Sequence, residues 1–185
     1  MDQWLEEEAM DQEALAAKGS QVGPKADMDR YGETLGGLKW LVIYGLKGTA
    51  AYADHAHILG QEDPEVFAFF HRALHQVSRE DITVDGMLSL ALEVGKVNLK
   101  VMEMLDRGNT GTYGDPVPTR VRVTPVKGKA ILVSGHDLKD LYELLKQTEG
   151  KGINVYTHGE MLPCHGYPKL KAFGHLVGNY GGAWQ

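Results

Sequence analysis

A glycine- and proline-rich segment at residues 108–118 divides the sequence into two parts with different hydrophobic periods. Before it, apolar residues recur every three or four positions, as on one face of an α-helix. After it, short apolar runs near residues 130, 153 and 175 alternate with polar, glycine-containing stretches. Because glycine and proline clusters usually mark loops and linkers, we predict a domain boundary here. The chain should therefore combine a helical part with an α/β part.

The helical part contains three long predicted helices, at about 28–59, 63–77 and 83–105. Asp63-Pro64 is a strong start signal for the second helix, and Thr83 is a candidate cap for the third. Short connections favour antiparallel neighbours in a bundle. The residues expected on the packed faces are Leu35, Leu38, Val42, Leu46, Thr49 and Ala53; Val66, Phe67, Phe70, Leu74 and Val77; and Leu88, Leu92, Leu99 and Met102.

The second part has the pattern of a βαβαβ run, which implies a parallel sheet with right-handed crossovers. The run at 130–133 is continuously apolar and is predicted to be buried on both faces. Val121 and Val123 alternate with arginines and predict a short exposed strand. The remaining expected elements are strands at 153–156 and 176–177, an amphipathic helix at 138–147 and a short helix within 166–173.

These elements predict an α and α/β fold, a helical bundle followed by a partial parallel Rossmann-like α/β domain. Residues 3–17 have helical composition, and the break at 19–26 separates them from the bundle. The predicted domains are 1–27, an N-terminal helix and linker; 28–110, the bundle of three long helices; and 111–185, the partial α/β domain.

Charge and cysteine content exclude several functions. Nineteen Lys and Arg against 25 Asp and Glu give a net charge of −6, so neither nucleic acid nor a membrane is the expected partner. The single Cys164 cannot form an intramolecular disulfide or by itself hold an iron–sulfur cluster. The acidic run Glu6-Glu7-Glu8 is unlike a secretory signal, and no apolar run approaches the ~20 residues that span a bilayer. A cytoplasmic protein is expected.

Ligands of parallel α/β sheets bind beyond the carboxyl ends of the strands. His136 follows the first predicted buried strand and Glu160 follows the next. Since adjacent strands lie ~4.8 Å apart, the two side chains can face a common centre. An imidazole and a carboxylate together suit a borderline or hard metal ion such as iron. The alternative is that His136 caps the following helix and Glu160 is solvated.

Other histidines and the cysteine carry weaker signals. His71 and His75 have chelating i, i+4 spacing but no evident third ligand, and His55 and His57 point in different directions on one helix. Cys164, near His158 and His165, is either a thiolate or a small buried residue, and the buried role is preferred. Gly178–Gly182 lacks the spacing of a dinucleotide-binding loop and is more simply a tight turn.

Four segments resemble the hybrid-cluster protein family, also called prismane or hydroxylamine reductase, and the resemblance runs in order from about residue 28 to the end. They are Gly-Leu-Lys-Gly-Thr-Ala-Ala-Tyr-Ala-Asp-His-Ala (45–56), Ile-Leu-Val-Ser-Gly-His-Asp-Leu-Lys-Asp-Leu (131–141), Val-Tyr-Thr-His-Gly-Glu-Met-Leu-Pro (155–163) and Val-Gly-Asn-Tyr-Gly-Gly-Ala-Trp (177–184).

The resemblance implies an iron–sulfur oxidoreductase related in fold to the nickel carbon monoxide dehydrogenases. The family reduces hydroxylamine to ammonia, and nitric oxide chemistry is also attributed to it. It carries a cubane-type cluster and an iron–sulfur–oxygen hybrid cluster, and receives electrons from a redox protein. By motif, His136 matches the hybrid cluster's histidine ligand and Glu160 its first glutamate ligand.

The departures from the family pattern lead us to expect an internal piece of such an enzyme: the later part of its helical domain and the first half of the next domain. The cysteine-rich motif of the cubane cluster is absent. The family's ligand cysteines and second glutamate lie downstream of the Gly-Asn-Tyr-Gly-Gly motif, and the sequence ends at Gln185, three residues after that motif. Cys164 falls where the family often has a small residue. We therefore expect neither cluster to be complete in this chain and expect the isolated chain to be inactive. Asp137 and His158 are candidates to orient the ligands or relay protons.

Two alternatives remain open at this point. The chain could be a cofactor-free scaffold or binding module with the same fold, and an uncovered sheet edge would then favour self-association. It could also be a small hydrolase with one metal ion at His136, Glu160 and a third ligand, His158 or Cys164. The hydrolase is the weakest alternative, because no nucleophile set or metalloprotease motif accompanies those residues.

Overall fold

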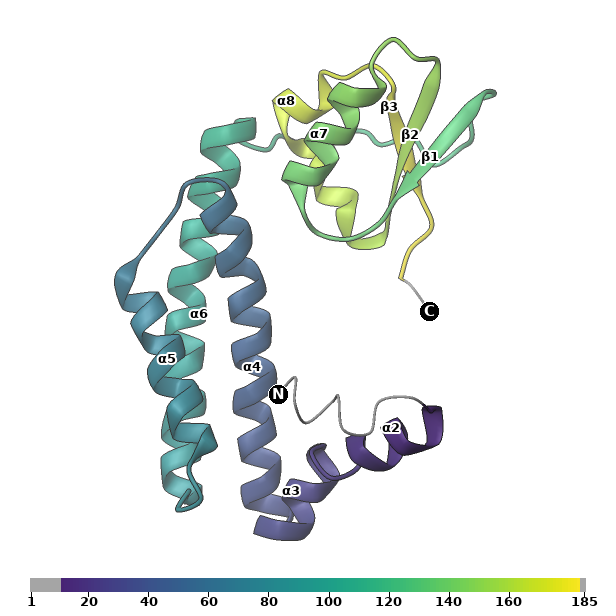
Figure 1. Cartoon of the computed structure of the whole chain (residues 1–185). Coiled ribbons are helices and arrows are strands. Elements are labelled where there is room, and N and C mark those ends of the chain that lie inside the picture. The colour runs from purple at the N-terminus through teal and green to yellow at the C-terminus, as the bar shows by residue number, and fades with distance from the viewer. Residues whose placement is uncertain (1–10, 184–185) are drawn as a thin grey trace. The chain divides into compact units, whose positions relative to one another are not determined.

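The computed structural model describes residues 11–183 and shows a mostly helical chain with one small parallel sheet, the α and α/β fold expected (Figure 1). Its residues form two compact units. Unit 1 comprises residues 11–51 and 63–100, and unit 2 comprises residues 52–62 and 101–183. No helix within 11–183 is both long and apolar enough to cross a bilayer.

Five helices belong wholly or partly to unit 1. In chain order they are α2 (Gln12–Gly19), α3 (Pro24–Tyr31), α4 (Glu33–Ile58), α5 (Pro64–Ser78) and α6 (Val84–Tyr113). The predicted helix at 28–59 is therefore two helices. Gly32 separates them with φ +82°, a backbone conformation that glycine adopts without strain. Part of the predicted helix at 3–17 lies outside the described residues.

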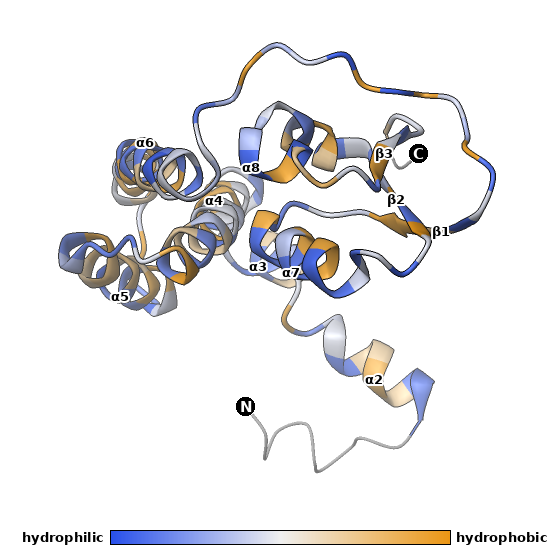
Figure 2. Ribbon diagram, turned by 90° about the horizontal axis from the view of Figure 1, so that it is seen from above, coloured by the Kyte–Doolittle hydropathy of each residue, from blue (hydrophilic) through white to orange (hydrophobic). Residues whose placement is uncertain are grey.

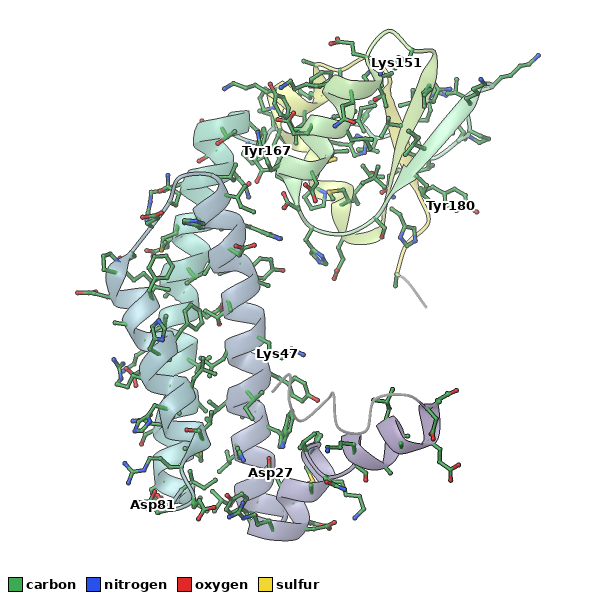
Figure 3. The ribbon with its side chains drawn as sticks, in the orientation of Figure 1. Asp27, Lys47, Asp81, Lys151, Tyr167 and Tyr180 are labelled. Carbon is green, nitrogen blue, oxygen red and sulfur yellow. The ribbon has the colours of Figure 1, made fainter. Side chains whose placement is uncertain are left out.

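The start signals of the next two helices are confirmed. The Asp63 carboxylate accepts a hydrogen bond of 2.8 Å from the Glu65 backbone N–H, with Pro64 in the first turn of α5. The Thr83 hydroxyl accepts one of 3.2 Å from the Gly86 N–H at the start of α6. At the start of the unit, Asp27 of α3 (labelled in Figure 3) accepts from the Trp40 indole and the Lys39 ammonium of α4, each at 2.8 Å.

The core of unit 1 lies between α4, α5 and α6, where apolar positions alternate with polar ones around each helix (Figure 2). The face predicted for α4 is confirmed at Val42, Leu46 and Thr49, and a Cβ on Gly45 would lie 3.0 Å from Val94, so the two helices approach closely there. The buried members of this core are Val42, Leu46, Phe69, Ala73, Val77, Met87, Leu90 and Val94.

The face predicted for α5 is partly right, and the face predicted for α6 is wrong. Val66 and Val77 of α5 are buried as predicted, but Phe67 and Leu74 are exposed, whereas Phe69 and Ala73 are buried. On α6, every residue of the predicted face is exposed, and a second apolar stripe is buried in its place. The exposed residues are Leu88, Leu92, Leu99 and Met102, and the buried ones are Met87, Leu90, Val94, Val101 and Met104.

Unit 2 contains the ends of α4 and α6 together with the α/β elements. These elements are β1 (Lys129–Val133), α7 (Leu138–Thr148), β2 (Ile153–His158), the 3₁₀ helix η1 (Gly159–Gly166), α8 (Pro168–Lys171) and β3 (Leu176–Tyr180). The strands are parallel in the order β1-β2-β3, with Lys129 opposite Ile153 and Tyr156 opposite Gly178. The predicted βαβαβ order is confirmed.

One face of the sheet is covered and the other is not. Helices α7 and α8 lie on the same side of the strands in Figures 1 and 2, and their apolar residues pack with Val155 of β2. On the opposite face, Ala130 is exposed and Leu132 of β1 is 55% exposed. The prediction that 130–133 is buried on both faces is therefore wrong. Tyr180, at the end of β3 in Figure 3, is also exposed.

Two local predictions around the segment at 108–118 are also corrected. Residues 108–113 continue α6, and Gly108 lies against Leu59, where a side chain would be crowded. Residues 121–123 form no strand. The Arg122 carbonyl accepts a hydrogen bond of 2.9 Å from the Asn179 N–H of β3. The two segments approach so closely that a Cβ on Gly178 would lie 2.3 Å from the same oxygen. The predicted domain limits at 27 and 110 stay predictions.

Candidate functional site

His136 stands at the junction between β1 and α7. Gly135, with φ +121°, turns the chain out of the strand. Asp137 is then the N-cap of α7, because its carboxylate accepts hydrogen bonds from the backbone N–H groups of Lys139 (2.7 Å) and Asp140 (3.2 Å). The alternative that His136 itself caps the helix is wrong, because Asp137 supplies the cap.

Glu160 stands at the corresponding position after β2, in the first turn of η1. Its carboxylate Oε2 contacts His136 Nε2. The structure therefore brings together the two side chains that were predicted to face a common centre. The His136 side chain is 35% exposed and that of Glu160 is 65% exposed, so both reach solvent as well as each other. Their role as metal ligands stays a prediction.

A cavity of about 280 Å³ in unit 2 opens beside this pair. Tyr52 of α4 packs edge-on against the His136 ring, with 6.5 Å between ring centroids, and also against His55 at 6.0 Å. His57 instead pairs with Glu62 at 2.9 Å, so the two histidines of α4 do point in different directions. The polar side chains lining the cavity are Tyr52, His55, Asn109, His136, Asp137 and Glu160.

Cys164 is a buried thiol. It has no solvent exposure, and burial raises its pKa to about 12, so the thiol stays protonated near neutral pH and is a poor nucleophile. The prediction of a small buried residue is confirmed. It packs in the core of unit 2 with Leu141, Leu145 and Met161.

His158 joins the ends of two strands, because its Nδ1 lies 3.1 Å from the Ser134 hydroxyl that follows β1. Within residues 11–183, no three His, Cys, Asp or Glu side chains gather closely enough to hold one metal ion. The third ligand that the hydrolase alternative requires is thus not placed beside His136 and Glu160. His136 and Glu160 supply an imidazole nitrogen and a carboxylate oxygen, two donor atoms of types that suit iron.

A buried polar group next to Glu160 was missed from the sequence. Thr157, His165 and Asn179 are 0%, 6% and 7% exposed. The Thr157 hydroxyl lies 2.9 Å from His165 Nε2 and donates a 3.0 Å hydrogen bond to Asn179 Oδ1. The sequence does contain a signal for such a group. Thr157 and Asn179 are polar residues at inward-facing strand positions, which are normally apolar beside a helical layer, so each needs a buried hydrogen-bond partner.

We predict that His165 makes stability depend on pH. Burial lowers the pKa of His165 below its usual 6.5, so between that value and the lowered one the unfolded chain binds more protons than the folded chain. The free energy of unfolding should therefore fall as the pH is lowered through about 6.5. Urea unfolding at pH 7.5 and 5.5 should show a smaller difference for His165→Gln than for the unmodified chain. Equal differences would contradict the prediction.

Comparison with known proteins identifies one family and several relatives that share one name. The model of the Prismane/CO dehydrogenase family matches residues 2–185. "Hydroxylamine reductase" of Syntrophobacter fumaroxidans is 58% identical over 173 residues, 94% of this chain and 32% of that protein. "Hydroxylamine reductase" of Escherichia coli (strain K12 / DH10B) and of Shigella boydii serotype 18 are each 52% identical over 171 residues, 92% of this chain and 31% of theirs. The chain thus spans about a third of the length of these relatives.

Proposed function

Because this chain belongs to the prismane/CO dehydrogenase family, we propose that it forms part of an oxidoreductase that reduces hydroxylamine, and that His136 and Glu160 bind iron of its cluster. The observation that carries the proposal is the contact between these two side chains at the carboxyl ends of neighbouring parallel strands. The substrate follows from the name of the relatives, hydroxylamine reductase.

The donor atoms suit the role. A neutral imidazole nitrogen is a common ligand of iron, and a carboxylate oxygen is a hard donor suited to an oxo-bridged iron. When bound, an iron–sulfur–oxygen cluster would supply stored electrons and an open coordination position for the reduction of hydroxylamine to ammonia and water with two electrons and two protons. The other ligands would come from parts of the relatives that this chain does not span, and the electrons from a separate redox protein.

The contact between the two side chains also bears on iron binding. An imidazole nitrogen and a carboxylate oxygen bind a metal only without a proton on the donor atom, so any proton held between His136 and Glu160 would have to leave those atoms. The Asp137 cap would hold the backbone beside His136 in place.

A chimera tests the proposal. This chain replaces the matching segment of the Syntrophobacter hydroxylamine reductase, and iron per protein and hydroxylamine reduction are measured after anaerobic purification. Loss of an outer partner of a metal ligand already costs roughly 10–100-fold in affinity or activity. His136→Ala and Glu160→Gln should therefore each lower both readouts about tenfold or more.

The controls are matched by residue type and exposure. His71→Ala and Glu149→Gln alter an exposed histidine and an exposed glutamate away from the cavity, and both chimeras should keep their iron. The 185-residue chain alone, reconstituted with iron and sulfide, should bind close to none. Full iron content in the His136→Ala chimera would refute the ligand assignment, and several irons per isolated chain would show that ligands are completed between chains.

A further inference from the structure

Glu160 lies inside a loop whose two ends are joined by a buried hydrogen bond. The loop begins at Thr157, the next-to-last residue of β2, and includes most of η1, up to His165. Across its base, the Thr157 hydroxyl and His165 Nε2 are 2.9 Å apart. Both residues are buried, so water is not at hand to replace the bond if it is lost.

The directions of the hydrogen bonds in this group are fixed by its donors. Asn179 Nδ2 donates to the Gly181 carbonyl at 3.2 Å, so its Oδ1 faces Thr157. The single hydroxyl hydrogen of Thr157 goes to that oxygen at 3.0 Å, and Thr157 Oγ1 can then only accept from His165. His165 must therefore carry a hydrogen on Nε2.

The group joins three chain segments around Glu160. Thr157 belongs to β2, His165 to η1 and Asn179 to β3. The backbone N–H of Asn179 also donates a hydrogen bond to the Arg122 carbonyl. Glu160 itself has an exposed side chain, so its position relative to His136 depends on how the surrounding backbone is held. That backbone is held by the buried bonds at the loop base and by the packing of Met161 and Cys164 in the core.

We propose that Thr157 and His165 are positioning residues, whose hydrogen bond closes the loop and places the Glu160 carboxylate against His136. The value of this placement for cluster binding rests on the proposed function, but the placement itself does not. Neither residue touches the cavity beside His136, so they act through the backbone that carries Glu160.

Substitutions at Thr157 separate the hydroxyl from the volume of the side chain. Thr157→Val keeps the volume and removes the hydroxyl, whereas Thr157→Ser keeps the hydroxyl. In the 185-residue chain, ¹⁵N and ¹³C NMR should show the Glu160 amide and the His136 ring signals shifted in Thr157→Val and restored in Thr157→Ser. The His165 ring nitrogens should report protonated Nε2 in the unmodified chain and a changed pattern in Thr157→Val only.

His165→Gln covers the case in which Thr157→Val does not fold, because the glutamine amide can donate from nearly the same position as Nε2. It should keep the His136 and Glu160 signals, whereas His165→Leu should shift them. Unchanged His136 and Glu160 signals in either folded variant that lacks the bond would overturn the proposal, since a merely structural bond would lower stability without moving those groups.

The chimera then distinguishes the two proposals. At limiting iron, Thr157→Val should retain about tenfold less iron than Thr157→Ser, in the range seen for partners that orient metal ligands. If Thr157→Val shifts Glu160 while His136→Ala keeps its iron, the positioning role stands and the ligand assignment fails. If His136→Ala loses iron while Thr157→Val neither shifts Glu160 nor loses iron, the ligand assignment stands and the positioning role fails.

Discussion

Phe69→Ala is expected to lower the free energy of unfolding of unit 1 by about 3–5 kcal/mol. Phe69 is 1% exposed in the core between α4, α5 and α6, and truncation would leave a cavity that rigid helices fill poorly. Urea unfolding followed by far-UV circular dichroism measures the loss. Hydrogen exchange should place the loss of protection within residues 11–51 and 63–100.

Leu92→Ala is the matched control on the neighbouring helix. Leu92 lies on the face predicted for α6 but is 64% exposed, so its truncation should change stability by no more than about 0.5 kcal/mol. Equal losses for the two variants would mean that the exposed stripe of α6 is covered in solution, and the assignment of the core would have to be revised.

Leu141→Ala is expected to cost about 2–5 kcal/mol and to disturb the site as well. Leu141 is fully buried on the face of α7 that packs with Leu145 and Val155. It lies one turn after the Asp137 cap, so loosening α7 also loosens the backbone beside His136. The measurements are urea unfolding and the NMR signals of the His136 ring.

Gln147→Ala provides the comparison on the same helix. Gln147 is exposed, and alanine is a good helix former, so neither stability nor the His136 signals should change appreciably. Loss of stability in Leu141→Ala with an unmoved His136 ring would show that the N-terminus of α7 is held by its cap alone.

Local signals in the sequence predicted the order of the elements and the meeting of the two central side chains. Asp63 and Thr83 mark helix starts because a capping oxygen satisfies backbone N–H groups that the helix leaves unpaired. His136 and Glu160 could be paired in advance because parallel strands place their carboxyl ends at one edge of the sheet.

Periodicity could not decide which face of α6 is buried. Leu88, Leu92 and Leu99 recur at helical spacing, and so do Met87, Leu90 and Val94. Only packing against α4 and α5 selects the second set, and it leaves the first exposed. The same limit applies to 108–113, whose glycines are typical of a linker although the segment continues α6, with Gly108 against Leu59.

The partner of Thr157 was also beyond sequence reasoning. Its inward-facing position could mark Thr157 as a buried polar residue, but its pairing with His165 depends on how η1 folds back toward β2. That geometry belongs to the loop as a whole rather than to either residue's propensity.

The buried thiol of Cys164 gives this chain an experimental advantage. It is the single cysteine, fully buried and with a pKa raised to about 12, so thiol-directed labels react with it only when unit 2 opens. The rate at which Cys164 is labelled therefore reports how often unit 2 opens. A second cysteine engineered at an exposed position would accept a fluorophore or spin label selectively, without first removing Cys164.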